Sequence, residues 1–291
     1  METKNILKKV RKIEIKTRGL SNQIFAGEYH SAFKGKGMAF SEVREYAFGD
    51  DIRNIDWNVT ARFNHPYVKI FEEERELTVM LLIDVSGSNE FGTQAQLKED
   101  MITEIAAVLS FSAIKNNDKV GVIFFSDRVE KFIPPKKGTS HILRIIRELI
   151  DFKPESQKTD ISEGLRFFTN IIKKRSTTFI LSDFLDEGFD NALKIASRKH
   201  DLSAVRIFDR RETTLPKMGI VKFFDKEQGK DVWIDTNDAQ TREWYNKWWT
   251  RKDRELRDLF LKSGVDEAII RTDRDYVPPL VNMFKRREAR R

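Results

Sequence analysis

The chain has 291 residues, of which 40% are hydrophobic and 34% charged, and its formal net charge is +7. This length fits one large domain or two modest ones, with enough apolar content for a hydrophobic core. The absence of cysteine excludes disulfides and zinc–thiolate sites. No apolar run approaches the ~20 residues that span a bilayer, and the N-terminus lacks the apolar core of a signal peptide. We therefore expect a soluble, cytoplasmic protein.

The net positive charge is concentrated at the two ends of the chain. Residues 1–37 carry nine basic against three acidic residues, and the C-terminal sequence FKRREARR is also strongly basic. Residues 4–22 combine this charge with apolar residues at helical spacing, which predicts a basic amphipathic helix. Such ends are compatible with an acidic partner, nucleic acid or anionic lipid, and equally with a solvated surface that aids solubility. We expect membrane contact to be peripheral at most.

A segment of matched opposite charges follows, within residues 30–77. Acidic and basic residues crowd around Trp57, in the sequence GDDIRNIDWNVTAR. Such a cluster is typical of an ion-pair network that holds a loop, and a second carboxylate site is the alternative. Tyr67–Phe71 alternates apolar and polar residues and predicts a strand. We assign residues 1–76 to an N-terminal region that packs on the core, 77–275 to the main domain, and 276–291 to a basic tail.

From residue 78 onward, apolar strands alternate with amphipathic helices. The predicted strands cover residues 78–83, 119–125, 129–133, 177–181, 204–208 and 266–271. The predicted helices cover 94–116, 139–152, 161–174, 191–197 and 241–263, and residues 219–235 predict a β-hairpin insertion. This alternation predicts an α/β fold with a doubly wound, mostly parallel sheet of Rossmann-like order 3-2-1-4-5-6, in which the first and fourth core strands are neighbours.

Oxygen-bearing side chains cluster at the carboxyl ends of these two strands. Asp84, Ser86 and Ser88 follow the first strand, and Asp183 follows the fourth. Thr159 precedes the helix that leads into the fourth strand. Ligands bind open α/β sheets at this edge, where the strand order reverses. Oxygen ligands suit a hard divalent cation such as Mg²⁺, or Mn²⁺.

The pattern Asp84-x-Ser86-x-Ser88, then Thr159, then Asp183, resembles the metal-ion-dependent adhesion site of von Willebrand factor A domains. In addition, GKGMAFSEVREYAFGDDIRNIDWNVTAR followed by VKIFEEERE resembles the N-terminal signature of the bacterial domain-of-unknown-function 58 family, whose members carry such a domain. The resemblance implies that these five residues hold Mg²⁺ directly or through water. It also implies that a partner's carboxylate completes the coordination. Family proteins are associated with MoxR-type AAA+ ATPases, which implies such an ATPase as a partner.

We therefore predict a non-catalytic, Mg²⁺-dependent protein-interaction module that works with a MoxR-type ATPase in the assembly or maturation of a client complex. One alternative is a Mg²⁺-dependent phosphohydrolase with Asp84 as nucleophile. Enzymes of that kind place a second carboxylate two residues on as general acid, and here that position is Ser86. Another alternative is nucleic-acid binding through the basic ends and Trp244, Trp248 and Trp249. No specific nucleic-acid motif is present, and aromatic residues at helical spacing more often belong to a core.

Overall fold

The computed structural model describes residues 11, 13–14, 39–72, 77–87, 97–225 and 230–289. The chain divides into two compact units, one formed by residues 33–77 and the other by the rest of the chain. The predicted N-terminal helix lies outside the described residues except for 11, 13 and 14, which are helical. None of the helices in the described ranges is both long and apolar enough to cross a membrane.

The larger unit is built on one six-stranded sheet with the order β10-β7-β6-β3-β4-β5. The strands, in chain order, are β3 (Thr78–Asp84), β4 (Lys119–Phe125), β5 (Val129–Lys136), β6 (Thr177–Ser182), β7 (Asp201–Phe208) and β10 (Asp266–Arg271). All neighbours pair in parallel except β5, which pairs antiparallel with β4. Numbered from β3, this is the predicted order 3-2-1-4-5-6, and the predicted α/β fold class is confirmed.

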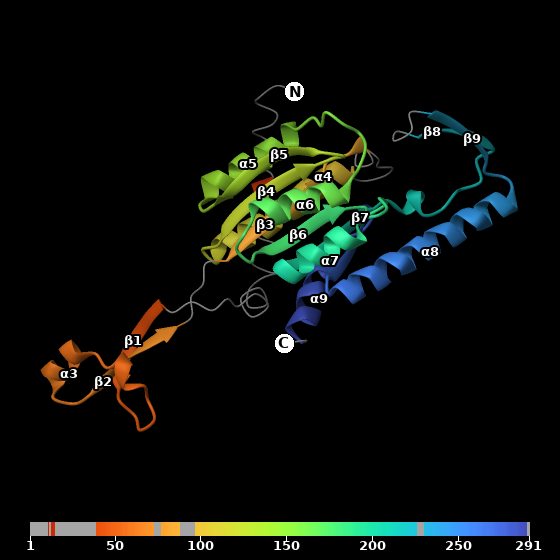
Figure 1. Ribbon diagram of the computed structural model, residues 1–291. Helices are drawn as coiled ribbons and strands as arrows, with labels where there is room; N and C mark the ends of the chain where they lie inside the picture. Colours follow the sequence, from red (N-terminus) through yellow and green to blue (C-terminus); the bar gives the residue numbers. More distant parts are fainter. Residues whose placement is uncertain are drawn as a thin grey trace. The chain divides into compact units, whose positions relative to one another are not determined.

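Helices cover both faces of this sheet (Figure 1). They are α4 (Lys98–Lys115), α5 (Thr139–Asp151), α6 (Ile161–Ile171), α7 (Asp190–Lys199), α8 (Ala239–Ser263) and α9 (Val277–Glu288). Alternate strand residues such as Met80, Leu82 and Ile180 form one core cluster with α6, α7 and α8. On the other face, Phe284 of α9 packs against Phe179, with ring centroids 6.1 Å apart. Strands buried on both faces explain why the sequence shows continuous apolar runs rather than alternation.

The C-terminal residues do not form the predicted basic tail, because Val277–Glu288 is helix α9. Leu280, Met283 and Phe284 are fully buried, and they share one face of the helix at a spacing of three and four residues. Pro278 and Pro279 stand in the first turn, where a missing backbone N–H costs nothing. Lys285 and Arg286 are exposed, whereas Arg287, one turn after Phe284, is buried and pairs with Asp266. The basic charge therefore masked an amphipathic pattern.

The smaller unit pairs β1 (Ala39–Glu45) antiparallel with β2 (Tyr67–Glu72), and between these strands lie the short helices η1 (Ile52–Asn54) and α3 (Trp57–Phe63). Arg44 donates two hydrogen bonds to the Asp50 carboxylate, at 2.8 and 2.7 Å. Asp51 and Asp56 accept backbone hydrogen bonds as the N-caps of the two helices. These contacts support the structural interpretation of the charged segment. Trp57 is not its buried anchor, however, since the side chain is 68% exposed.

An insertion separates β7 from β10, and it consists of the hairpin β8 (Ile220–Asp225) and β9 (Lys230–Asp235) followed by α8. The hairpin lies at the N-terminal end of the long helix (Figure 1). Trp249 is buried, and its ring centroid lies 6.4 Å from that of Phe208. Trp244 is exposed. The tryptophans of α8 therefore divide between packing and surface, and Trp249 belongs to the core.

His200 at the end of α7 gives the fold a predictable sensitivity to acid. Its side chain is buried, Nδ1 lies 3.1 Å from the Ser176 hydroxyl, and the ring packs on Phe168. Burial, helped by Lys199 and Arg175, lowers the pKa of His200 to about 4. The unfolded chain therefore binds a proton first as the pH falls, so stability is lost between pH ~6.5 and ~4, by about 2–3 kcal/mol.

Urea unfolding at several pH values tests this expectation. The variant His200→Phe should remain within about 1 kcal/mol of the wild type at neutral pH and should become the more stable protein near pH 4.5. A stability difference between the two proteins that does not change with pH would contradict a neutral, buried His200.

Candidate metal centre

Asp84 ends strand β3 with its carboxylate held in a fixed orientation. The side chain is 1% exposed. Its Oδ1 accepts a hydrogen bond from the Ser86 backbone N–H at 2.9 Å, and its Oδ2 accepts one from the Ser182 hydroxyl at 2.7 Å. Ser182 is the last residue of β6, the parallel neighbour of β3. Burial, and then the nearby Asp183, raise the pKa of Asp84 to about 6.

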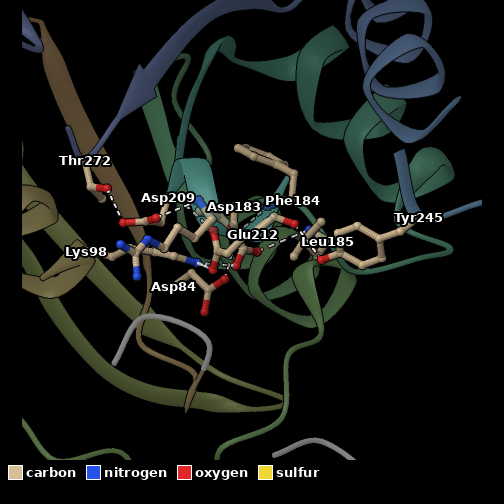
Figure 2. Close-up of polar contacts among 11 residues, drawn as sticks. Asp84, Lys98, Asp183, Phe184, Leu185, Asp209, Glu212, Tyr245 and Thr272 are labelled. Carbon is tan, nitrogen blue, oxygen red and sulfur yellow. Dashed lines mark hydrogen bonds and ion pairs between the residues drawn. The ribbon is translucent and has the colours of Figure 1, made fainter. Parts of the chain in front are cut away.

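Asp183 directly follows β6 and is also buried. The carboxyl ends of β3 and β6 therefore lie side by side, as the sequence predicts. Its Oδ1 accepts a hydrogen bond from the Leu185 backbone N–H at 3.2 Å. Its Oδ2 accepts one from the Lys98 ammonium at 3.1 Å. Two carboxylates at the ends of adjacent strands thus face the same edge of the sheet, as Figure 2 shows.

Of the other predicted site residues, Ser86 is buried beside Asp84, whereas Ser88 lies outside the described residues. Thr159 is half-buried in the loop before α6, and the structure does not bring it to Asp84 by a direct hydrogen bond. The two loops do meet, because the Gly87 N–H donates to the Gln157 carbonyl at 3.0 Å. Asp160 caps α6 as its side chain accepts the Glu163 N–H, which fixes where this loop ends.

Lys98, in the first turn of α4, is the residue that sequence reasoning missed. It has no exposed surface, and its Nζ lies 3.1 Å from Asp183 Oδ2 and 2.5 Å from Glu212 Oε1. Burial alone would lower the pKa of Lys98, but Asp183 and Glu212 outweigh it and raise that pKa. A lysine in the first turn of an amphipathic helix is normally solvated, so nothing in the local sequence marks this one as buried.

Glu212 connects the cluster to the rest of the sheet through the short helix η3 (Arg210–Glu212) (Figure 2). Its second carboxylate oxygen accepts the Asp209 backbone N–H at 2.8 Å, which completes a capping box. The Asp209 side chain in turn accepts the Thr272 hydroxyl at 2.6 Å. The Tyr245 hydroxyl donates to the Glu212 carbonyl at 2.5 Å. The ends of β6, β7 and β10 and helix α8 are therefore tied together beside the two aspartates.

The charge of this cluster fits a divalent cation. Asp84, Asp183 and Glu212 supply three negative charges and Lys98 supplies one positive charge, which leaves two negative charges in a buried site. Carboxylate and hydroxyl oxygens are the donors that Mg²⁺ and Mn²⁺ accept. Within the described ranges, no three carboxylates or histidines converge to form a metal cage. A cation here would therefore rely on hydroxyls and water beside the two aspartates.

Comparison with known proteins yields relatives of unassigned function. An uncharacterized protein of Mycobacterium tuberculosis is 26% identical over 281 residues, which cover 96% of this chain and 88% of that protein. The uncharacterized protein YeaD of Bacillus subtilis is 28% identical, over 38% of this chain and 25% of its own length.

Among solved structures, the conserved hypothetical protein BatB from Bacteroides thetaiotaomicron aligns with a TM-score of 0.48 at 16% identity. The alignment covers 74% of this chain and all of that one. The SpRpn10 VWA domain aligns with a TM-score of 0.36 at 10% identity, covering 72% of this chain and 95% of that domain.

The family model described as "Protein of unknown function DUF58" matches residues 42–255, which is most of the chain. The match covers the charged segment of the smaller unit, strands β3 to β7 of the sheet and most of α8, and it ends before β10. This chain therefore belongs to the DUF58 family.

Proposed function

We propose that this protein is a non-catalytic, Mg²⁺-dependent interaction module, in which the cation bridges the cluster at the ends of β3 and β6 to a carboxylate of a partner protein. The observation that carries the proposal is the buried pair Asp84 and Asp183, whose negative charge Lys98 compensates only in part. A hard cation placed there would keep coordination positions for water or an outside carboxylate. The affinity of the module for its partner would then depend on the metal.

The chemistry around Asp84 supports binding rather than turnover. A phosphohydrolase that used Asp84 as nucleophile would need a general acid two residues further on, and that residue is Ser86. Both oxygens of Asp84 already accept hydrogen bonds, from Ser86 and Ser182. These contacts orient the carboxylate as a ligand and lower its reactivity as a nucleophile.

The partner that we propose is a MoxR-type AAA+ ATPase, with a client protein as donor of the carboxylate. The proposal of an ATPase rests on the charged N-terminal segment, which resembles the signature of the DUF58 family. Members of that family are associated with MoxR-type ATPases. We further propose that the module acts in the cytoplasm, in the assembly or maturation of a client complex.

Co-purification tests this function directly. The chain is expressed with a MoxR-type ATPase from the same genome and isolated in Mg²⁺ or in EDTA, as wild type, as Asp84→Asn and as Asp118→Asn. Asp118 is a matched control because it is also a buried aspartate, but it lies just before β4, at the opposite end of the strands. The ATPase should accompany the wild type and Asp118→Asn in Mg²⁺ only, and should not accompany Asp84→Asn.

Co-purification that survives both EDTA and Asp84→Asn would contradict the proposal. A Mg²⁺-dependent hydrolysis of simple phosphomonoesters that Asp84→Asn abolishes would instead identify the phosphohydrolase alternative.

A further inference from the structure

The free edge of strand β10 presents backbone groups that could pair with another strand. Among the described residues, β10 pairs only with β7, so it is one border of the sheet. The Thr272 N–H is donated to β7, whereas the Glu267 carbonyl accepts a hydrogen bond from Arg286 on the other side, at 2.6 Å. Because backbone groups alternate sides along a strand, those of Ile269 and Arg271 also point away from β7. The Arg271 carbonyl already accepts the Arg274 N–H at 3.1 Å in the turn that follows, so the Ile269 N–H and carbonyl and the Arg271 N–H are the groups that face an incoming strand.

A groove of ≈1050 Å³ runs along this edge, between helices α8 and α9. Ion pairs fix both walls to the sheet. Arg206 of β7 is buried and lies 2.5 Å from Asp253 of α8. Arg287 of α9 lies 3.0 Å from Asp266 of β10. The groove is therefore part of the folded structure, so a ligand would not need to open it.

The lining of the groove is predominantly basic. Five basic side chains face two acidic ones, Glu267 and Asp275. The basic residues are Arg257, Arg271, Arg274, Lys285 and Arg286. Two of these five pair with aspartates outside the groove. Arg257 pairs with Asp253 at 3.0 Å, and Arg271 forms a bidentate pair with Asp273, so the charge of these two arginines is partly compensated. An acidic ligand would be attracted to the groove along its length.

Edge strands commonly carry charged residues and prolines that prevent aggregation. Strand β5, at the opposite border of the sheet, has such prolines. Strand β5 contains Pro134 and Pro135, which have no N–H to offer an incoming strand. Strand β10 contains no proline, and its border is flanked by a groove of one predominant charge. The two borders therefore differ in their capacity to accept a strand.

We propose that the free edge of β10 binds an acidic polypeptide segment of a partner protein in extended conformation, as an added strand. The N–H and carbonyl of Ile269 and the N–H of Arg271 would pair with the segment, and the groove arginines would bind its carboxylates. The requirement for backbone pairing favours a polypeptide over a nucleic acid as the occupant. This surface is separate from Asp84 and Asp183, so binding there should not depend on a metal.

Fluorescence anisotropy with a labelled peptide of alternating glutamate and valine tests the proposal on the full chain. The peptide should bind equally in Mg²⁺ and in EDTA, and its glutamine counterpart should bind at least about tenfold more weakly. Two further peptides carry N-methyl groups on the glutamate amides or on the valine amides. In an added strand, either the glutamate amides or the valine amides face β10, and N-methylation removes the N–H that would pair. One peptide should therefore lose affinity at least about tenfold, and the other should retain it.

Protein variants provide the matched comparison. Arg274 lines the groove and is exposed, and Arg274→Glu should weaken peptide binding about tenfold without changing the melting temperature. Arg166 is an exposed arginine of α6 that does not line the groove, so Arg166→Glu, with the same change of charge, should bind the peptide like the wild type.

Three results would overturn the inference. If both N-methylated peptides bind like the parent peptide, the groove attracts polyanions without forming a strand. If a single-stranded oligonucleotide binds more tightly than the peptide and displaces it, the occupant is nucleic acid. If the protein forms a dimer that blocks peptide binding and that Arg274→Glu dissociates, the occupant is a second copy of this chain.

Discussion

Replacing Lys98 by methionine should lower the free energy of unfolding by about 3–5 kcal/mol in the absence of added metal. Methionine matches the length of the lysine side chain but removes the ammonium that lies between Asp183 and Glu212. The buried Asp183 and the largely buried Glu212 would then lie next to Asp84 without a compensating cation. The large effect arises from the carboxylates left uncompensated rather than from the strength of the ion pair itself. Urea unfolding followed by circular dichroism measures it.

Two further variants separate charge from packing. Lys115 is exposed near the end of the same helix, so Lys115→Met should change stability by no more than about 0.5 kcal/mol. The double variant Lys98→Met, Glu212→Gln should recover part of the loss, because it removes one of the two uncompensated charges. A Lys98→Met protein as stable as the wild type would mean that the buried ion network does not exist as described.

Mg²⁺ should raise the melting temperature of the wild type, and Asp84→Asn should abolish that response. At a free concentration one hundred times the dissociation constant, a ligand bound only by the folded state adds about 2.7 kcal/mol to stability. For a protein of this size, that corresponds to a rise of roughly 4–6 °C. Without Mg²⁺ the Asp84→Asn variant should remain folded, since it removes one of two carboxylates that repel each other. Differential scanning calorimetry in Mg²⁺ and in EDTA measures both quantities.

The control for this experiment is again Asp118→Asn, which should keep the full Mg²⁺ response. A rise in melting temperature that persists in Asp84→Asn would place the metal elsewhere. No rise in the wild type at millimolar Mg²⁺ would argue against a resident magnesium site of useful affinity.

Much of the main unit could be predicted from the sequence because its strands are buried on both faces. Runs such as Thr78–Ile83 and Thr177–Leu181 are apolar or β-branched at every position, which is typical of a central strand of a covered sheet. The strand order follows from general rules of connection, and that order places Asp84 and Asp183 together. The proximity of the two aspartates therefore follows from the order of the strands, which the sequence pattern predicts well.

The remainder could not be predicted because it depends on contacts between distant segments. Lys98 and Glu212 are separated by more than one hundred positions, and neither lies in a motif that indicates burial. Helix α9 was missed for a different reason, since Pro278, Pro279 and a run of basic residues suggested a tail. Its apolar residues carried the correct signal, but three positions on one face weigh little against so much charge.

The hydrogen bond from Tyr245 to Glu212 has a consequence for the β8–β9 hairpin. The chain leaves the sheet at Phe208, shortly before Glu212, and the Tyr245 hydroxyl of α8 donates a hydrogen bond to the Glu212 carbonyl. The hydrogen bond between Glu212 and Tyr245 closes the segment between these two residues. That segment includes the β8–β9 hairpin with its exposed Trp233. A change in the length or sequence of the hairpin should therefore leave the carboxylates of the cluster in place.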